Sequence, residues 1–448
     1  MHRKTDIYDL GYIYFSIGKE NEAFMNRDID NKFAGNYLLG GIDFFLRFFY
    51  YFVKSPFSYQ KTLKRPDAVM IYGESVNNRN TLLPIIERLD DNQLIDLFSH
   101  RQFPKWRMYW YAIPHLFEFI REIKKNSQEK RDTVKNFFAK FWMMYGSDKA
   151  AGELLDYYRP KALVLANDHL PFHRSMMHEA NRRGIPTIYV QHAAVTEKFP
   201  PLSFTYSFLD GEDSFRKYKQ KTETSGNIYL SGGIRFDVIK DIKKIESADK
   251  TTVGVAINMV DDEGIVKNVC LELRDLCLGE GHIRVLLRPH PQMHLDIWRL
   301  WCEGNGIEFS NSKEETSFNF INRINVLVSN QSSIHLDAAM CHTPSVVYGL
   351  SKAELVDSYS FVKNGLCRKV NSIEELKSFI TDSGAYQAPP MAVKYYNSSY
   401  GAVYEGMVAT MIADLIKSMP DRINTFNEKY HFGLIESDEK KRVYAPFE

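Results

Sequence analysis

The stretch VLVSNQSSIHLDAAMCHTPSVVY, residues 326–348, joins an apolar run, five consecutive polar residues and a helical pattern. The run INVLV (324–328) has the length and composition of a buried strand. Three apolar side chains recur at the spacing of one helix face: Ile334, Ala338 and Cys341. The stretch therefore predicts a strand, a polar loop and a helix that leads to another strand, which is the repeating unit of a parallel α/β sheet.

Short apolar runs alternate with helical patterns on both sides of this stretch. The predicted strands are residues 67–72, 161–166, 186–190, 204–209 and 227–231 in the first half, and 252–257, 283–288, 324–328 and 344–348 in the second. The charged, weakly periodic segment KDIKKIESADK (240–250) lies between the two series and has the composition of a linker. This alternation predicts an α/β chain with two Rossmann-like domains that face each other across a cleft.

The length of the chain, 448 residues, also exceeds what one hydrophobic core usually serves. We expect an aromatic-rich N-terminal extension, two α/β domains, and a C-terminal helix and tail that packs back on the first domain. These segments are residues 1–65, 66–240, 251–388 and 389–448. Because ligands of open parallel sheets bind beyond the carboxyl ends of the strands, the loops after the predicted strands are the candidate site.

Composition excludes several classes of function. Hydrophobic residues make up 44% of the chain and charged residues 25%, and the formal net charge is +1, so no nucleic-acid partner is expected. The five cysteines form no CxxC pair, so neither a zinc site nor a disulfide framework is indicated, and we expect no metal or other cofactor. The N-terminus lacks the apolar core of a signal peptide, and no apolar run is long enough to span a membrane. We therefore expect a cytoplasmic protein.

The polar loop at 329–333 has two interpretations. One of its side chains is enough to cap the following helix, and such a cap contributes about 1 kcal/mol. Five consecutive polar residues exceed that need and predict a phosphate-binding loop at the positive end of a helix dipole. The predicted phosphate-binding residues of this loop are Ser329, Gln331, Ser332 and Ser333. Asp337, in the first helical turn, either complements the dipole or orients a hydroxyl of the ligand.

The predicted strand at 283–288 ends in Arg288-Pro289-His290-Pro291. The two prolines end the strand and fix the backbone. Arg288 matches phosphate oxygens with two N–H groups, and His290 donates to a phosphate or protonates a leaving group. The alternative interpretation is a rigid turn with two solvated polar residues.

Two further polar residues lie in loops that we expect at the same site. Asn258 follows the predicted strand at 252–257 and is a candidate contact to the ligand. Arg235 lies in SGGIRFD (231–237) and either pairs with Asp237 or reaches the ligand.

Histidine and carboxylate residues follow three predicted strands of the first half. Glu74 follows the first of them, Asn167-Asp168-His169 follow the second, and Gln191-His192 follow the third. A histidine after a buried strand is often only a hydrogen-bonded structural residue. Because several such loops share one edge of the sheet, we expect a site that activates an acceptor, with His192, Asp168 or Glu74 as the base.

Four motifs, taken in this order, resemble those of the GT-B transferases of bacterial surface polysaccharides. They are GIPTIYVQHA (184–193), SGGIRFD (231–237), LLRPHP (286–291) and VSNQSSIHLDAAMCHTPSVVY (328–348). The most similar groups are the CDP-glycerol glycerophosphotransferases of teichoic-acid synthesis and the capsule-polysaccharide (Kdo-transferase-like) enzymes. The sequence departs from the family pattern at Ala193, Gly233-Ile234 and Asn330, which leaves the identity of the donor open.

This resemblance implies a GT-B fold and a metal-independent glycosyltransferase. The implied reaction moves a sugar from a CMP-, CDP- or UDP-linked donor to a growing surface glycan, free or lipid-linked, such as a capsule, O-antigen or teichoic-acid-like polymer. By resemblance, His192 is a base or an acceptor-site residue. The residues that the resemblance places on the donor phosphates are Arg288, His290, Ser332 and Ser333. The alternatives are transfer of a CDP-linked glycerol or ribitol phosphate, 2-epimerisation of a UDP-sugar, and an inactive scaffold.

Two aromatic-rich segments have no place in this site. IDFFLRFFYYFVK (42–54) is interrupted by Asp43 and Arg47, and residues 101–125 interleave Trp and Tyr with six Lys or Arg residues. One interpretation is core helix packing. The other is a peripheral surface on the inner membrane, with aromatic side chains at the headgroup level and basic residues on anionic lipid.

Overall fold

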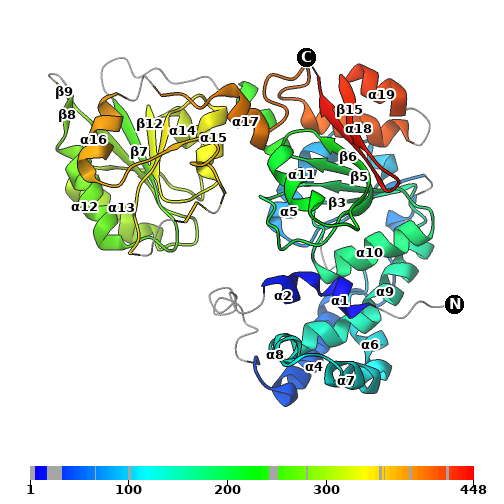
Figure 1. The fold of residues 1–448 in the computed structure, drawn as a ribbon. Coiled ribbons are helices and arrows are strands. Elements are labelled where there is room, and N and C mark those ends of the chain that lie inside the picture. Colours follow the sequence, from blue (N-terminus) through cyan, green and yellow to red (C-terminus); the bar gives the residue numbers. More distant parts are fainter. Residues whose placement is uncertain are drawn as a thin grey trace. The chain divides into compact units, whose positions relative to one another are not determined.

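The computed structural model describes residues 6–17, 33–65, 67–98, 102–241, 251–278, 281–352, 356–357, 359–382, 386–419 and 423–447. The chain divides into two compact units (Figure 1). Unit 1 consists of Met1–Ile234 and Met407–Glu448, and unit 2 consists of Arg235–Gly406. The α/β fold class predicted from the sequence is confirmed, because each unit is built on a largely parallel sheet packed against helices.

Unit 1 contains an eight-stranded sheet in the order β15-β16-β6-β5-β4-β3-β1-β2. The strands are β1 (Val69–Tyr72), β2 (Leu94–Leu97), β3 (Ala162–Leu165), β4 (Thr187–Val190), β5 (Ser203–Leu209), β6 (Ser225–Leu230), β15 (Phe432–Ser437) and β16 (Lys441–Pro446). Every neighbouring pair is parallel except the antiparallel hairpin of β15 and β16. Because β4, β3 and β1 are adjacent and parallel, the loops that follow these three strands lie at one edge of the sheet.

The helices of unit 1 pack closely at glycine positions. They are α1 (Ile7–Leu10), α2 (Tyr12–Ile17), α4 (Tyr37–Lys54), α5 (Val76–Ile86), α6 (Trp106–Ala112), α7 (Leu116–Lys124), α8 (Gln128–Asn136), α9 (Phe138–Tyr158), α10 (Pro171–Arg182), α11 (Glu212–Lys219), α18 (Val408–Ser418) and α19 (Ile423–Lys429). A Cβ atom on Gly146 of α9 would lie 1.9 Å from the carbonyl oxygen of Met108 in α6. Glycine is therefore required where α6 crosses α9.

Unit 2 contains a six-stranded parallel sheet in the order β11-β10-β7-β12-β13-β14. Its strands are β7 (Thr252–Ala256), β10 (Arg284–Arg288), β11 (Glu308–Phe309), β12 (Val326–Ser329), β13 (Ser345–Val347) and β14 (Arg368–Lys369), beside a separate hairpin of β8 (Cys277–Leu278) and β9 (Gly281–His282). Its helices are α12 (Glu263–Arg274), α13 (Leu295–Asn305), α14 (Ser317–Asn322), α15 (Ile334–Met340), α16 (Ile373–Thr381) and α17 (Pro390–Tyr396). Alternate residues of β12 enter two different hydrophobic clusters, which shows that the sheet is buried on both faces.

The nine strands predicted from apolar runs are all present, within three residues at either end. The sequence did not predict β2, β11 and β14, nor the hairpin of β15 and β16 that extends the sheet of unit 1. β2, β11 and β14 are short strands at or near the edge of a sheet, and β15 and β16 consist largely of exposed and half-exposed residues, so none of them has a continuous apolar run. Most of the predicted linker, residues 242–250, lies outside the described residues.

The aromatic segment 42–54 lies within α4, an 18-residue helix with two apolar faces. Phe44 and Phe48 are buried, and the ring of Phe44 stacks on Trp142 of α9 at 3.8 Å between centroids. Phe49 and Val53, on the other side of the helix, are exposed. Core packing therefore explains only a minority of the apolar residues in this helix. In the described part of the chain, no helix is long and apolar enough to cross a membrane.

Candidate active site

The predicted base candidates of unit 1 lie in the loops after three adjacent strands. Glu74 follows β1, Asp168 follows β3 and His192 follows β4. The three groups are close enough to interact electrostatically. The charge of Asp168 acts on the pKa of His192, and both Glu74 and His192 act on the pKa of the buried His173. The fold thus brings the three residues to one edge of the sheet, as predicted from the parallel order of the strands.

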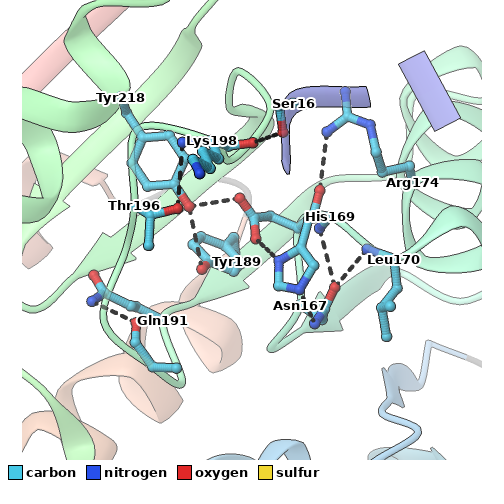
Figure 2. Close-up of polar contacts among 12 residues, drawn as sticks. Ser16, Asn167, His169, Leu170, Arg174, Tyr189, Gln191, Thr196, Lys198 and Tyr218 are labelled. Atoms are coloured by element: carbon cyan, nitrogen blue, oxygen red, sulfur yellow. Dashed lines mark hydrogen bonds and ion pairs between the residues drawn. The ribbon is translucent and has the colours of Figure 1, made fainter. Parts of the chain in front are cut away.

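Asp168 is the centre of a buried hydrogen-bond network. Its carboxylate accepts from the Tyr218 hydroxyl at 2.6 Å and lies 3.0 Å from Nδ1 of His169, while Arg174 donates to its backbone carbonyl at 3.0 Å (Figure 2). The residue is fully buried. Burial alone would raise the pKa of Asp168, but the hydrogen bonds from His169 and Tyr218 outweigh it and hold the pKa below its ordinary value. Both carboxylate oxygens are therefore engaged by the protein.

His169 and His192 form a pair of imidazole rings beside this carboxylate. Their ring centroids are 6.2 Å apart, and Phe199 lies 4.4 Å from the His169 ring. Burial lowers the pKa of His192, although the charge of Asp168 opposes the shift. Nδ1 of His192 has no hydrogen-bond partner among the described residues, whereas Nδ1 and Nε2 of His169 lie within hydrogen-bond distance of Asp168 and Asn167. His192 thus combines a neutral ring with unused hydrogen-bonding capacity.

Glu74 is held in a separate ion pair. Its Oε1 accepts from Nζ of Lys105 at 2.7 Å and from the Tyr72 hydroxyl. Burial would raise the pKa of Glu74, but the Lys105 ammonium, His173 and the hydrogen bond from Tyr72 together outweigh it and lower the pKa to about 2. His173 is fully buried beside Tyr72, with their ring centroids 4.7 Å apart, and neither of its ring nitrogens has a hydrogen-bond partner in the described part of the chain. Burial lowers the pKa of His173 to about 3.

The N-terminal helices support this edge of unit 1. Asp9 of α1 accepts from Nε and Nη2 of Arg174 at 3.0 and 2.6 Å, and lies 2.6 Å from Nε2 of His178. Arg174 in turn binds the carbonyl of Asp168, so α1 is connected to the network through one buried guanidinium. The hydroxyl of Ser16 in α2 donates to the carbonyl of Lys198, in the loop after β4 (Figure 2).

In unit 2, the predicted donor residues follow three adjacent strands. The sheet places β7 between β10 and β12, so the loop of Asn258 lies between that of His290 and the polar loop at 329–333. Asn258 donates from Nδ2 to the carbonyl of Gln331 at 3.1 Å. Asn330 donates to Asp261 at 2.8 Å. These contacts fix the polar loop against the loop that follows β7.

The five polar residues of the opening stretch have different partners. The buried hydroxyl of Ser329 donates to the carbonyl of Ala256 at 2.7 Å and is a structural contact. The hydroxyl of Ser332 accepts weakly from the N–H of Ile334, at 3.4 Å, while Ser333 is the N-cap residue of α15 but its side chain makes no capping bond. Oε1 of Gln331 has no partner within the described residues. Capping therefore accounts for little of this loop.

The main-chain groups of the loop point to the same conclusion. Gln331 donates its N–H to the side chain of Asn330 at 2.7 Å. The N–H groups of Ser332 and Ser333 donate to no atom of the described residues. Ser332 is half-buried and Ser333 is exposed, so both N–H groups are open to a ligand at the start of the helix.

Arg288 and His290 are more constrained than the sequence indicated. The guanidinium of Arg288 donates to the Ser310 hydroxyl at 2.9 Å and to the Glu315 carbonyl at 2.8 Å, and lies over the Phe320 ring. Burial lowers the pKa of Arg288, against the charges of Glu315 and Asp337. Nδ1 of His290 accepts from the N–H of Gln292 at 3.3 Å. Arg288 thus contributes its positive charge while two of its nitrogens hold the fold.

Arg235 pairs with Asp337, not with Asp237 as one interpretation of the sequence predicted. The carboxylate of Asp337 is buried in α15, whereas the side chain of Arg235 is partly exposed and lies over the Phe236 ring. The sequence could not favour this pair, because the two residues are 102 positions apart. The ion pair joins the first residue of unit 2 to the helix that follows the polar loop.

Sequence reasoning missed several residues of both networks: Asp9, Lys105, His173, Tyr218 and Asp261. Each lies on a helix or loop distant in sequence from its partner, so no local pattern indicates the contact. Among the residues that the structure describes, no group of three His, Cys, Asp or Glu side chains is placed to hold a metal ion.

Comparisons with known proteins find similar structures but no matching family. No protein-family model matches the sequence, and no curated protein matches it. Similar solved structures include the UDP-GlcNAc 2-epimerase from Neisseria meningitidis bound to UDP-GlcNAc (13% identity, 78% of this chain and 100% of that chain, TM-score 0.47). They also include MurG from Acinetobacter baumannii (12% identity, 79% of this chain and 100% of that chain, TM-score 0.44). A third is the wall teichoic acid polymerase TagF (13% identity, 83% of this chain and 91% of that chain, TM-score 0.44). These likenesses are distant, and the function proposed below rests on the residues of this chain.

Proposed function

We propose that this chain is a GT-B glycosyltransferase that moves a sugar from a CMP-, CDP- or UDP-linked donor to a growing bacterial surface glycan. In this proposal, residues 66–240 form the acceptor domain and residues 251–388 bind the donor. The observation that carries the proposal is the loop after β12, where Ser332 and Ser333 present N–H and hydroxyl groups that the described protein leaves largely unused. The order of the four sequence motifs supports the same function.

The donor phosphates would be bound by this loop and the two loops beside it. Phosphate oxygens are strong acceptors, and hydrogen bonds to charged groups are roughly twice as strong as neutral ones. The N–H and hydroxyl groups of Ser332 and Ser333 supply hydrogen-bond donors, and Asn258 holds the loop in place. The positive charge of Arg288 and the imidazole of His290 would stabilise the negative charge that develops on the departing nucleotide.

Among the three base candidates, the geometry favours His192. Both oxygens of Asp168 are engaged in a buried network, which suits a group that orients its neighbours. Glu74 is paired with Lys105, and its pKa of about 2 makes it a weak proton acceptor. His192 is half-buried, its pKa is lowered, and its Nδ1 has no partner in the described part of the chain, so the neutral ring can take a proton at neutral pH.

The proposed step is a displacement at the anomeric carbon of the donor sugar. The acceptor hydroxyl loses its proton to His192 as its oxygen bonds to the anomeric carbon of the sugar. The bond from that carbon to the phosphate oxygen breaks, and its electron pair leaves with the nucleotide. The positioning residues for this step are Asp168, His169 and Tyr218, because they fix the loop beside His192.

Nucleotide release from a panel of CMP-, CDP- and UDP-linked donors tests the proposal, with and without a surface-glycan acceptor. The expected result is release that requires the acceptor and a product heavier by one sugar. An isomerised nucleotide sugar formed without acceptor would instead identify an epimerase, and a product heavier by glycerol or ribitol phosphate would identify a polyol phosphotransferase. Nucleotide binding without any turnover would identify a scaffold.

A further inference from the structure

The side of α4 that faces away from the core is apolar and exposed. Its exposed side chains recur at helical spacing: Leu38, Ile42, Phe45, Leu46, Phe49 and Val53. Phe49 retains 59% of its accessible surface. The polar residues Asp43 and Arg47 of this helix pair with each other at 2.9 Å and do not interrupt the exposed row. An amphipathic surface helix normally turns its apolar face inward, so a second, outward apolar face needs another explanation.

The apolar surface continues from α4 onto α7. Phe117 of α7 is 80% exposed, and Trp110 at the end of α6 is also exposed. Between α4 and α7 runs a groove of about 920 Å³ whose lining includes Ile42, Phe45 and Ile120. Figure 1 shows these helices together with α8 at the end of unit 1 away from the sheet. A contiguous apolar surface of this extent is larger than scattered exposed apolar side chains and marks a binding surface.

Basic side chains border this surface and are not neutralised by the protein. Arg121, Lys124 and Lys125 are exposed at the end of α7, and Lys124 also lines the groove. None of the three forms an ion pair within the described ranges, whereas the nearby Glu118 is paired with His115. Apolar and aromatic side chains next to unpaired cations match the chemistry of an anionic lipid surface, where hydrocarbon lies directly below phosphate groups.

We propose that this face of unit 1 binds the surface of an anionic lipid bilayer, with α4 lying along the boundary between headgroups and acyl chains. The exposed row of α4 enters the acyl region, Trp110 and Phe117 lie at the headgroup level, and Arg121, Lys124 and Lys125 contact lipid phosphates. Charge complementarity favours lipid over a second copy of the chain, because two copies of this face would bring like charges together. The proposal goes beyond the transfer reaction and does not depend on it.

Flotation of the full chain with vesicles tests the proposal, using phosphatidylcholine alone and phosphatidylcholine with about one third phosphatidylglycerol. The wild type is expected to float with the anionic vesicles and at least tenfold less with the neutral ones. The double variant Leu46→Glu/Phe49→Glu and the double variant Lys124→Glu/Lys125→Glu are each expected to lower binding at least tenfold. All four positions are exposed, so thermal unfolding of both variants should match the wild type.

A matched control places the same change on the other unit. Ile297 and Leu300 of α13 are 56% and 64% exposed, and the double variant Ile297→Glu/Leu300→Glu is expected to float like the wild type. Absence of wild-type flotation would overturn the proposal, as would unchanged flotation of Leu46→Glu/Phe49→Glu. Light scattering without lipid measures the oligomeric state and so tests whether the face binds a second copy of the chain. If the wild type is a dimer and Leu46→Glu/Phe49→Glu is a monomer, the face binds a second copy of this chain, and the proposal of lipid binding is overturned. Because no nucleotide or acceptor is present, these outcomes are independent of the proposed transferase function.

Discussion

The hydroxyl of Tyr218 can be removed with little change in packing, because phenylalanine fills the same space. In the wild type this hydroxyl donates to Asp168 at 2.6 Å, and both residues are buried. Tyr218→Phe therefore leaves a buried carboxylate with one donor fewer, while His169 still contacts the other oxygen. We expect the variant to fold and to be less stable than the wild type.

The size of the expected loss of stability follows from the charge of the Asp168 carboxylate, which accepts the hydrogen bond. A hydrogen bond to a charged group contributes about 1.5–3 kcal/mol to the free energy of unfolding. For a unit of this size, that loss corresponds to a fall in melting temperature of roughly 3–10 °C at neutral pH. Scanning calorimetry of the transition of unit 1 measures it directly.

The pH dependence identifies the carboxylate as the cause. The pKa of Asp168 in the folded protein is below its ordinary value of 3.8, so the hydrogen bonds to the carboxylate stabilise the fold above about pH 4. That stability is lost as the pH falls through the folded pKa, because the carboxyl becomes protonated. The difference in melting temperature between the wild type and Tyr218→Phe should therefore shrink below pH 4.

Tyr189→Phe is the matched control, since it removes the same atom from a neighbouring buried tyrosine. Among the described residues, the Tyr189 hydroxyl contacts only that of Tyr218, at 3.5 Å. We expect a smaller loss of stability and no comparable dependence on pH. An equal effect of the two substitutions, or a Tyr218→Phe difference that stays constant down to pH 3, would refute the network described here.

Three further predictions concern the candidate site and the packing of α6 against α9. His192→Asn should lower kcat at least ~100-fold. In the wild type the rate should fall on acidification below the ordinary histidine pKa of 6.5, and pH–rate profiles should show that this fall is absent from the variant. Ser329→Ala should lower the free energy of unfolding by about 1–2 kcal/mol, while Ser333→Ala should weaken nucleotide binding and leave the melting temperature unchanged, as calorimetry will show. Gly146→Ala should cost at least about 2 kcal/mol in urea unfolding, because its Cβ would overlap the backbone of α6.

Parallel strand order explains why part of the site could be predicted. Once the apolar runs were assigned to parallel strands, their carboxyl ends had to lie at one edge, and this placed Glu74, Asp168 and His192 together. The same reasoning placed Asn258 beside the polar loop of unit 2, where it donates to Gln331. Residue type and position at a strand end were sufficient for these placements.

The chemical state of these residues could not be predicted, because it depends on partners distant in the sequence. Tyr218 is 50 positions from Asp168, and Asp9 is 165 positions from Arg174. The pKa of Glu74 is set by Lys105, from a segment whose pattern indicates only a basic, aromatic surface. Periodicity identifies the buried face of a helix, but not which buried group it meets.

The direct test of the donor site is isothermal titration calorimetry with CMP, CDP, UDP and GDP. Each nucleotide is titrated into the wild type and into the double variant Ser332→Ala/Ser333→Ala. The account predicts that at least one nucleotide binds the wild type. It predicts that the double variant binds that nucleotide at least ~10-fold more weakly, and that Tyr218→Phe, in the other unit, binds it normally. Absence of binding by all four nucleotides, or equal affinity in the double variant, would contradict the assignment of the 329–333 loop to the donor.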